Sequence, residues 1–485
     1  MLNNKGSTLA TVVMMSSILL IFAVAFSTSV VADVSQSAKQ QRNVEAHYIA
    51  MAGANAVSQK ILSMNELERK EFGKLAFPLT SNETLFEDGS FTVTINDYPD
   101  QIEIKSIGKV RDTEATVVHI LEKVESASTI ELEIPFAIFA KGMINFGGGN
   151  IKGDIATKSK AEGAIKLNWG AEFVDANSII VIPEGTDPNK IIKIPDWCNE
   201  FDNIKIEQKN IPDYPEPGIP SFPNFPSGLP EKGSIELSGA PGTMTISGDG
   251  YYDRISIAHS GKKLILNTGG ATTRIRVGEL SLNGGDKNPV IEIKGDGKVY
   301  IFVDNLKSFN GTVKAPDGAE VIFYIANSVG NVATLGADLE IQASLYFGDN
   351  IDVKIAGSCD IKGDIVMSPR CSISIAGGSE INLGTIYASN ANIDFGGSGT
   401  INGNVMLSQG KSVKLPGGTA VNGVVYAPSA DITFAGSGGV IGAVVGKDVS
   451  LTGGATVEHN DDSDLITIPI EVSDNQIEYK EGYWK

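Results

Sequence analysis

The chain has 485 residues, 54 of them glycine, and a formal net charge of −19. A chain of this length holds two or more structural units. The acidic balance argues against nucleic-acid binding through phosphate neutralisation and suits solubility outside the cell. Abundant glycine with only 7% aromatic residues favours stacked strands with tight turns over a helical bundle.

An uncharged run extends from Ser7 to Ala32, directly after Lys5 and Gly6. As a helix this run is roughly 39 Å long, enough to cross a bilayer core of about 30 Å. It is too long for the apolar region of a secretory signal, which has about 7–15 residues. The following residues contain no proline and favour helix. We therefore predict one helix over residues 7–73, with residues 9–32 spanning a membrane.

A short polar head ending in glycine, an apolar span and an unbroken amphipathic extension together resemble the N-terminus of a type IV pilin-like protein. Residues 40–54, with the sequence QQRNVEAHYIAMAGA, resemble most the N-terminal domain of PilX-type minor pilins. The resemblance implies that residues 1–6 are a prepilin-type leader. A membrane peptidase would cut between Gly6 and Ser7 and methylate the new N-terminus.

The resemblance also implies partners and a location. The partners are other pilins, which pack through the N-terminal helix, the prepilin peptidase, the pilus assembly platform and the membrane. The protein would cross the cell membrane once before assembly and be extracellular, in a pilus, afterwards.

One position departs from the pattern of pilins that build the filament shaft. Those pilins usually carry Glu at the fifth mature position, which here is Thr11. In the family this carboxylate offsets the amine of a neighbouring subunit inside the apolar filament core, where an unpaired charge is costly. Its absence indicates a minor or tip subunit. A plain signal-anchor helix is the alternative.

Residues 74–128 change to a period of two. Apolar and polar residues alternate over 90–95, 101–108 and 114–121, which predicts an antiparallel β-meander of about three strands. We expect this meander to pack against the N-terminal helix.

Glycine-rich sequence with short strands begins near residue 129. We predict a first β-solenoid segment over 129–210, because the phrase Ile151-Lys-Gly-Asp-Ile recurs unchanged at Ile361. Seven prolines then fall within residues 211–230, which excludes helix and a central strand. We interpret this stretch as an extended strap, with a Pro-rich ligand for a partner domain as the alternative.

Residues 231–485 carry the clearest repeat. A period near 20 with glycine turns is typical of a β-solenoid, whose coils bury apolar side chains by stacking. The predicted fold is therefore mainly β: a long N-terminal transmembrane and amphipathic helix, a short meander, and a parallel β-helix with rungs of about 20 residues. We expect residues 465–485 to cap it. The repeated apolar positions are Ile341, Ile361, Ile381, Ile401, Val421 and Ile441, and in a second series Val353, Ile373, Ile393, Val413, Ile432 and Val449.

The sequence predicts no catalytic residue, no cofactor and no metal site. The four histidines, His47, His119, His259 and His459, lie far apart in the sequence. The phrases at Gly248 and Gly295 lack the ligand series of a calcium loop. Cys359 and Cys371 are candidates for a disulfide, and Cys198 is a third cysteine whose state the sequence leaves open. The aspartates of the repeat show no common phase and are interpreted as turn and surface residues: Asp352, Asp360, Asp364, Asp394 and Asp431.

The function predicted is that of a minor pilin that displays a β-solenoid at the filament tip or surface, for assembly priming or adhesion. Two alternatives stay open. A membrane-anchored, carbohydrate-active β-helix enzyme would need a clustered charged face. A self-polymerising scaffold similar to bactofilins would need bare hydrophobic ends on its solenoid.

Overall fold

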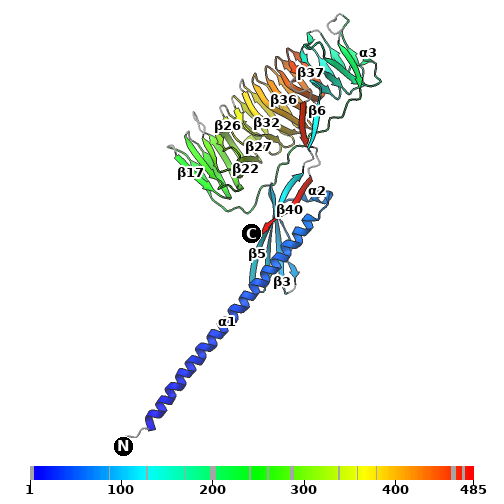
Figure 1. Ribbon diagram of the computed structural model, residues 1–485. Helices are drawn as coiled ribbons and strands as arrows, with labels where there is room; N and C mark the ends of the chain where they lie inside the picture. The colour runs from blue at the N-terminus through cyan, green and yellow to red at the C-terminus, as the bar shows by residue number, and fades with distance from the viewer. Residues whose placement is uncertain are drawn as a thin grey trace. The chain divides into compact units, whose positions relative to one another are not determined.

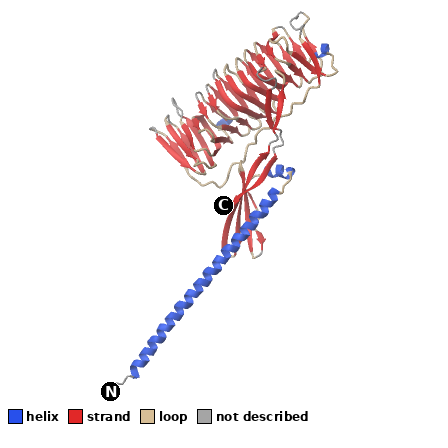
Figure 2. Ribbon diagram, viewed as in Figure 1, coloured by secondary structure: helices blue, strands red, loops and turns tan. Residues whose placement is uncertain are grey.

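A computed structural model describes residues 5–484, apart from gaps at 87, 127–128, 169, 197–203, 240–241, 259–260, 284–288, 337–338, 358, 378–379, 460–465 and 472–475. The chain forms two compact units (Figures 1 and 2). The helix–sheet unit comprises Met1–Glu125 with Gln476–Lys485, and the solenoid unit comprises Ser126–Asn475. In sequence, the solenoid unit is thus inserted into the helix–sheet unit.

Two helices open the helix–sheet unit, α1 (Lys5–Leu62) and α2 (Glu66–Gly73). The single helix predicted over 7–73 is wrong at this break. The Asn65 side chain accepts a hydrogen bond from the Glu68 amide, and the Glu68 carboxylate accepts one from the Asn65 amide, both at 3.0 Å. This reciprocal cap starts a new helix.

The sheet of this unit has the strand order β1-β3-β4-β5-β40, with β2 also paired to β3. The predicted meander strands lie in β3, β4 and β5, which pair antiparallel. Small residues let α1 approach β4 closely, because a Cβ on Gly108 would lie 2.2 Å from the Ala46 carbonyl oxygen. The strands are β1 (Leu79–Thr80), β2 (Thr84–Phe86), β3 (Gly89–Asp97), β4 (Gln101–Val110), β5 (Thr113–Ser126) and β40 (Gln476–Trp484).

The C-terminal strand β40 corrects the expectation that residues 465–485 cap the solenoid. It pairs with β5 at the edge of the helix–sheet unit. The Tyr479 ring contacts Phe72 of α2 with 6.1 Å between centroids, and the Trp484 ring stacks on His119 of β5 at 4.1 Å. Burial of the Tyr479 ring and stacking of Trp484 on His119, rather than coverage of an open solenoid end, hold the tail.

The solenoid unit is a parallel β-solenoid, as predicted (Figure 2). One stretch of its coils lies before the Pro-rich segment and a longer stretch after it. The earlier elements are β6 (Thr129–Ile134), β7 (Ile138–Ala140), β8 (Ile144–Phe146), β9 (Gly149–Lys152), β10 (Ile155–Thr157), β11 (Ile165–Leu167), β12 (Ala171–Phe173), β13 (Ile179–Pro183), α3 (Pro188–Ile191), β14 (Ile192–Lys193) and β15 (Lys205–Lys209).

The later stretch contributes most of the coils and ends in β39, which pairs antiparallel with β6. Its elements are β16 (Ser234–Leu237), β17 (Gly242–Ser247), β18 (Gly250–Ile257), β19 (Lys262–Asn267), β20 (Thr273–Asn283), β21 (Val290–Lys294), β22 (Lys298–Asn310), β23 (Thr312–Lys314), β24 (Glu320–Ile325), η1 (Val329–Asn331), β25 (Val332–Leu335), β26 (Leu339–Ile341), β27 (Ser344–Phe347), β28 (Asp352–Ala356), β29 (Cys359–Ile361), β30 (Ile365–Met367), β31 (Ser372–Ala376), β32 (Glu380–Ser389), β33 (Asn392–Asp394), β34 (Thr400–Ser408), β35 (Ser412–Pro416), β36 (Ala420–Gly436), β37 (Gly439–Gly453), β38 (Thr456–Glu458) and β39 (Ile466–Glu471).

The coils stack in an order that differs from their order in the chain. Ile138 of β7 pairs with Val444 of β37, and Ile151 of β9 pairs with Val457 of β38, all in parallel. The first coil of the chain therefore continues the stack where the last coil ends, as the meeting of β37 with the cyan strands in Figure 1 shows. One solenoid end is formed by β14 and β15 and the other by β16 and β17, each of which pairs with a strand on one side only.

The Pro-rich segment 211–230 closes this permuted arrangement. Without helix or strand over 211–230, it runs over an outward column of mostly apolar side chains. At one end the Tyr214 ring lies 4.4 Å from Phe139, and the Tyr426 hydroxyl donates to the Pro215 carbonyl at 2.6 Å. Further along, the Phe225 ring lies 5.3 Å from Phe302. These contacts cover the column, and Phe139, Tyr426 and Phe302 are fully buried beneath the strap.

The predicted repeat is confirmed with one exception. Ile381, Ile401 and Val421 stand in one register column, and Ile401 and Val421 are buried inside the solenoid. The next member of that column is Val440, which is 1% exposed, whereas Ile441 is 47% exposed. The coil after Val421 is one residue shorter than expected, and a shift of one residue moves a strand side chain to the opposite face.

Candidate functional site

The first part of α1 presents an apolar surface with no protein neighbour among the described residues. Met14 is 70% exposed and Phe26 is 76% exposed. In the described part of the chain, one helix is long and apolar enough to cross a membrane, with its candidate segment at Thr11–Leu62. Exposed apolar surface of this extent marks contact with lipid or with other proteins.

Four hydroxyl groups in this segment, those of Ser16, Ser17, Ser27 and Thr28, donate within the helix. The Ser17 hydroxyl donates to the Val13 carbonyl at 2.7 Å, and the Thr28 hydroxyl donates to the Ala25 carbonyl at 2.9 Å. Such bonds to the preceding turn leave no hydroxyl proton unpaired when water is removed. These four side chains therefore suit an apolar environment.

The predicted processing residues lie at the very start of this helix. α1 begins at Lys5, so Gly6 and Ser7 fall in its first turn and Thr11 lies one turn further on. Residues 1–4 of the predicted leader lie outside the described residues. Cleavage between Gly6 and Ser7 stays a prediction.

The second part of α1, which follows the apolar span, packs against the sheet of the helix–sheet unit. Ala46, Ile49 and Ala50 are buried against it, and Arg42 pairs with Asp112 of the β4–β5 turn at 2.9 Å. Another face of this helix is exposed and carries Asn43, Val44, His47 and Tyr48. His47 is exposed there, as expected for a surface histidine.

Several acidic side chains of the solenoid connect successive coils. Asp249, from the phrase that resembles part of a calcium loop, accepts the Arg274 amide at 2.8 Å. Asp364 accepts the Thr385 amide at 2.7 Å, and Asp154 accepts the Ile179 amide at 2.8 Å. Burial raises the pKa of Asp154. These carboxylates satisfy backbone donors at corners of the next coil.

The expectation that the repeat aspartates lack a common phase is wrong for two of them. Asp352 and Asp431 belong to one outward-facing column, which continues through polar residues of the coils between them. The Ser372 hydroxyl donates to Asp352 at 2.6 Å within this column. The intervening members are Ser372, Asn392 and Ser412.

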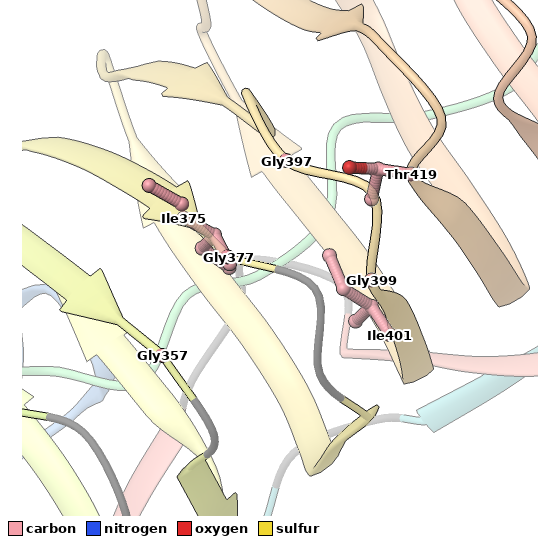
Figure 3. Close-up of a pocket in the computed structure, with 8 residues that line it drawn as sticks. Gly357, Ile375, Gly377, Gly397, Gly399, Ile401 and Thr419 are labelled. Atoms are coloured by element: carbon pink, nitrogen blue, oxygen red, sulfur yellow. The ribbon is translucent and has the colours of Figure 1, made fainter.

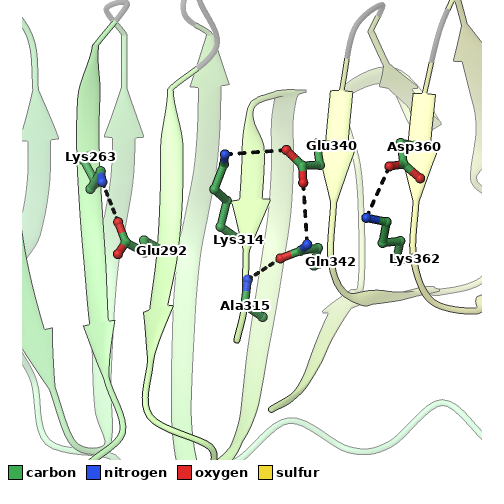
Figure 4. A network of polar contacts seen from close by, with 8 residues as sticks. All are labelled: Lys263, Glu292, Lys314, Ala315, Glu340, Gln342, Asp360 and Lys362. Carbon is green, nitrogen blue, oxygen red and sulfur yellow. Dashed lines mark hydrogen bonds and ion pairs between the residues drawn. The ribbon is translucent and has the colours of Figure 1, made fainter. Parts of the chain in front are cut away.

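A second polar face is drawn in Figure 4, on the sheet formed by β17, β19, β21, β23, β26 and β29. Lys263 pairs with Glu292 at 2.5 Å, and Lys362 pairs with Asp360 at 3.6 Å. Each of these carboxylates is neutralised by a lysine, so this face is a paired surface ladder rather than a set of carboxylates free for catalysis.

One pocket described in the solenoid unit is too small for a ligand. The pocket in Figure 3 has a volume of about 10 Å³ and is lined by glycines with Ile375, Ala376, Ile401 and Thr419. That is room for one water molecule at most. Among the described residues, no three His, Cys, Asp or Glu side chains gather as metal ligands.

The candidate disulfide between Cys359 and Cys371 is wrong. Both side chains are buried and unbridged. The Cys359 thiol donates to the Gly336 carbonyl at 3.1 Å, and the Cys371 thiol donates to the Gly348 carbonyl at 3.0 Å. Each cysteine thus packs in the core of its own coil. Cys198 and His259 lie outside the described residues.

These features define a protein with a single long apolar N-terminal helix, continuous with a helix–sheet unit that carries an inserted β-solenoid. Residues 404–465, within the last coils, match the family model of a domain of unknown function (DUF7305). None of the curated proteins matches the chain. Among solved structures, the competence-associated pilin ComZ from Thermus thermophilus is similar at 10% identity and a TM-score of 0.20, over 92% of this chain and 97% of that one. A TM-score this low does not establish a shared fold.

Proposed function

We propose that this chain is a minor subunit of a type IV pilus-like filament, which carries its β-solenoid at the filament tip or surface for assembly priming or adhesion. The observation that supports this role best is the division of α1. Its first part is apolar and exposed, and its second part is packed on an antiparallel sheet. The role is structural, with no catalytic step.

The proposed sequence of events starts in the membrane. The apolar part of α1 holds the precursor there, and a prepilin peptidase cuts between Gly6 and Ser7. The assembly platform then moves the helix from lipid into a filament, where it packs against the helices of other pilins. This transfer exchanges one apolar environment for another, so the exposed side chains stay out of water throughout. Thr11 in place of Glu suits a minor subunit.

Cleavage can be tested in cells that assemble the filament. N-terminal sequencing of the wild-type protein from sheared filaments should begin at Ser7. The Gly6→Leu variant should keep residues 1–6 and remain in the membrane fraction, because the scissile position no longer fits a peptidase that requires glycine. Thr8→Ala, which leaves both residues of the cut bond intact, is the control and should be processed normally. Filament-associated protein that begins at Met1 would refute the proposal in favour of a plain signal anchor.

A further inference from the structure

The two ends of the solenoid are protected differently. At one end the outermost strand β15 carries Lys205, Glu207 and Lys209 on alternate positions. Both lysines pair with Glu207, Lys209 at 2.6 Å, and their hydrogen bonds hold the pKa of Glu207 at about 2. A charged edge strand resists pairing with another strand, because its charges would lose water on contact.

At the other end, the edge strand β17 carries no charge. Its six residues, with the sequence GTMTIS, pair over their full length with β19. Within the described chain, the opposite edge of β17 has no backbone partner. An uncharged strand with one free row of amide and carbonyl groups is a template for a further strand.

The same end leaves part of the solenoid core uncovered. Met244 and Ile246 point inward, since they stand opposite the buried Leu264 and Leu266 of β19. Met244 is 38% exposed although Leu264, in the next coil, is only 1% exposed. The difference arises because the coil that contains β17 has a neighbouring coil on one side only. A strand added to β17 would cover Met244.

We propose that the free edge of β17 docks antiparallel against β17 of a second copy of this chain. A register that keeps one apolar face must place inward residues opposite inward residues. The register with Thr245 opposite Thr245 does so, and it pairs Met244 with Ile246 of the second copy. It uses five consecutive residues, Thr243–Ser247, and places two threonines across the two-fold axis, a favourable cross-strand pair.

A second copy suits this edge because β17 is self-complementary. At a two-fold contact each residue lies close to the same residue of the second copy. A charged residue on β17 would therefore be repelled by its copy, and β17 has no charged residue. At the opposite end, the charged edge strand β15 resists pairing with a strand of another copy. The contact therefore closes as a dimer instead of growing into the fibre expected of a self-polymerising scaffold. This proposal concerns the solenoid alone and holds whether or not α1 enters a filament.

Cysteine cross-linking tests the register in the full-length protein purified in detergent. In a Cys198→Ser background, Thr245→Cys should give a disulfide-linked dimer on mild oxidation, because the two thiols face each other across the axis. Thr243→Cys is the matched control, since its two copies would lie about 13 Å apart along the strands. We expect at least a several-fold higher dimer yield for Thr245→Cys. Equal yields, or no dimer from either variant, would overturn the proposal.

A charge variant separates this contact from association through α1. Thr245→Lys places two ammonium groups opposite each other, so light scattering at low salt should show loss of the dimer with unchanged circular dichroism. Thr312→Lys, an outward position on the interior strand β23 of the same sheet, should leave the dimer intact. A dimer that survives Thr245→Lys places the association elsewhere. A wild-type monomer whose edge instead captures an added β-strand peptide would assign β17 to a different partner.

Discussion

Gly149 has no side chain, and this lets its coil approach the last coil of the chain closely. Its φ is +111°, and a Cβ there would lie 2.1 Å from the Ala455 carbonyl oxygen. The two residues belong to coils that are about 300 positions apart in the chain but adjacent in the stack. An alanine would have to push the two coils apart, on top of the cost of a strained backbone.

Gly149→Ala is therefore expected to lower the free energy of unfolding of the solenoid by about 2 kcal/mol or more. Gly454→Ala is the matched control in the same turn region, since the nearest heavy atom would be the Gly436 carbonyl oxygen at 3.9 Å. Urea unfolding followed by circular dichroism measures both. Equal effects of the two variants would contradict the close contact at Gly149.

Protonation of His119 should change the stability of the helix–sheet unit. It is buried and stacked on Trp484 with an interplanar angle of 2°. Burial lowers its pKa, with Glu481 acting more weakly in the opposite direction. Its Nδ1 has no hydrogen-bond partner among the described residues. The folded unit thus holds this imidazole neutral.

A lowered histidine pKa gives a definite pH dependence. The unfolded chain takes up the proton near pH 6.5, while the folded unit does so only at lower pH. We expect the stability of this unit to fall as the pH drops below about 6.5 and down to the lowered folded pKa. His119→Phe, which keeps the stacking, should remove that fall. Fluorescence of Trp484 in a background with Trp169 and Trp197 changed to Phe follows this unit alone. An unchanged pH profile in the variant would contradict the assignment.

At the scale of elements, the length of the Pro-rich strap matches the stack that it covers. Twenty residues at about 3.1 Å each reach roughly 62 Å. Twelve steps of about 4.8 Å between coils span roughly 58 Å. The strap is therefore extended along most of its length, and its reach is close to that of the stack which it covers. The thirteen positions of the column are Val181, Ala156, Phe139, Val445, Tyr426, Met406, Tyr387, Val366, Tyr346, Tyr324, Phe302, Arg276 and Tyr251.

Tyr214 is the main anchor of this strap. It is 1% exposed and contacts the rings of Phe139 and Tyr426. Tyr214→Ala should lower the free energy of unfolding of the solenoid by about 3–5 kcal/mol, the range for deleting a buried aromatic side chain.

Tyr214→Phe is the control for that substitution. The Tyr214 hydroxyl has no hydrogen-bond partner in the described structure, so its removal should be neutral or stabilising. Denaturant midpoints of the three proteins give the comparison. Midpoints of both variants equal to that of the wild type would show that the strap does not stabilise the solenoid.

At the scale of the whole molecule, insertion makes the helix–sheet unit depend on the far end of the chain. β40 completes its sheet beside β5, after the full solenoid has intervened in sequence. Pairing of such distant segments closes a long loop, which slows folding more than it weakens the folded state. Within the solenoid unit, the antiparallel β6–β39 pair brings together the two segments that connect it to the helix–sheet unit in the chain.

Deletion of residues 476–485 should therefore destabilise the helix–sheet unit and spare the solenoid. Hydrogen exchange measured by mass spectrometry should show lost protection in β3, β4 and β5 with unchanged protection in β34 to β37. Removal of Lys485 alone is the control. Exchange that increased in β36 and β37 instead would restore the tail as a solenoid cap.

Local and periodic features were determined by the sequence alone. The apolar length of the N-terminal helix, the alternation of the meander strands and the 20-residue spacing of Ile381, Ile401 and Val421 each reflect contacts between neighbours in the chain or in consecutive coils. The candidate processing residues also came from sequence, through a resemblance that the structure does not test.

Tertiary structure alone decided the long-range arrangement. It pairs β7 with β37 and β40 with β5, and it leaves one edge of β17 without a partner among the described residues. The segments involved have no periodic relation to each other in the sequence. Even Ile441 was misplaced by one residue, because a strict 20-residue step was kept after Val421, although the second series already shortens to 19 residues between Val413 and Ile432. Sequence periodicity reports which side chains face inward, whereas the order in which coils meet depends on close contacts such as Gly149 against Ala455, which only the folded chain brings together.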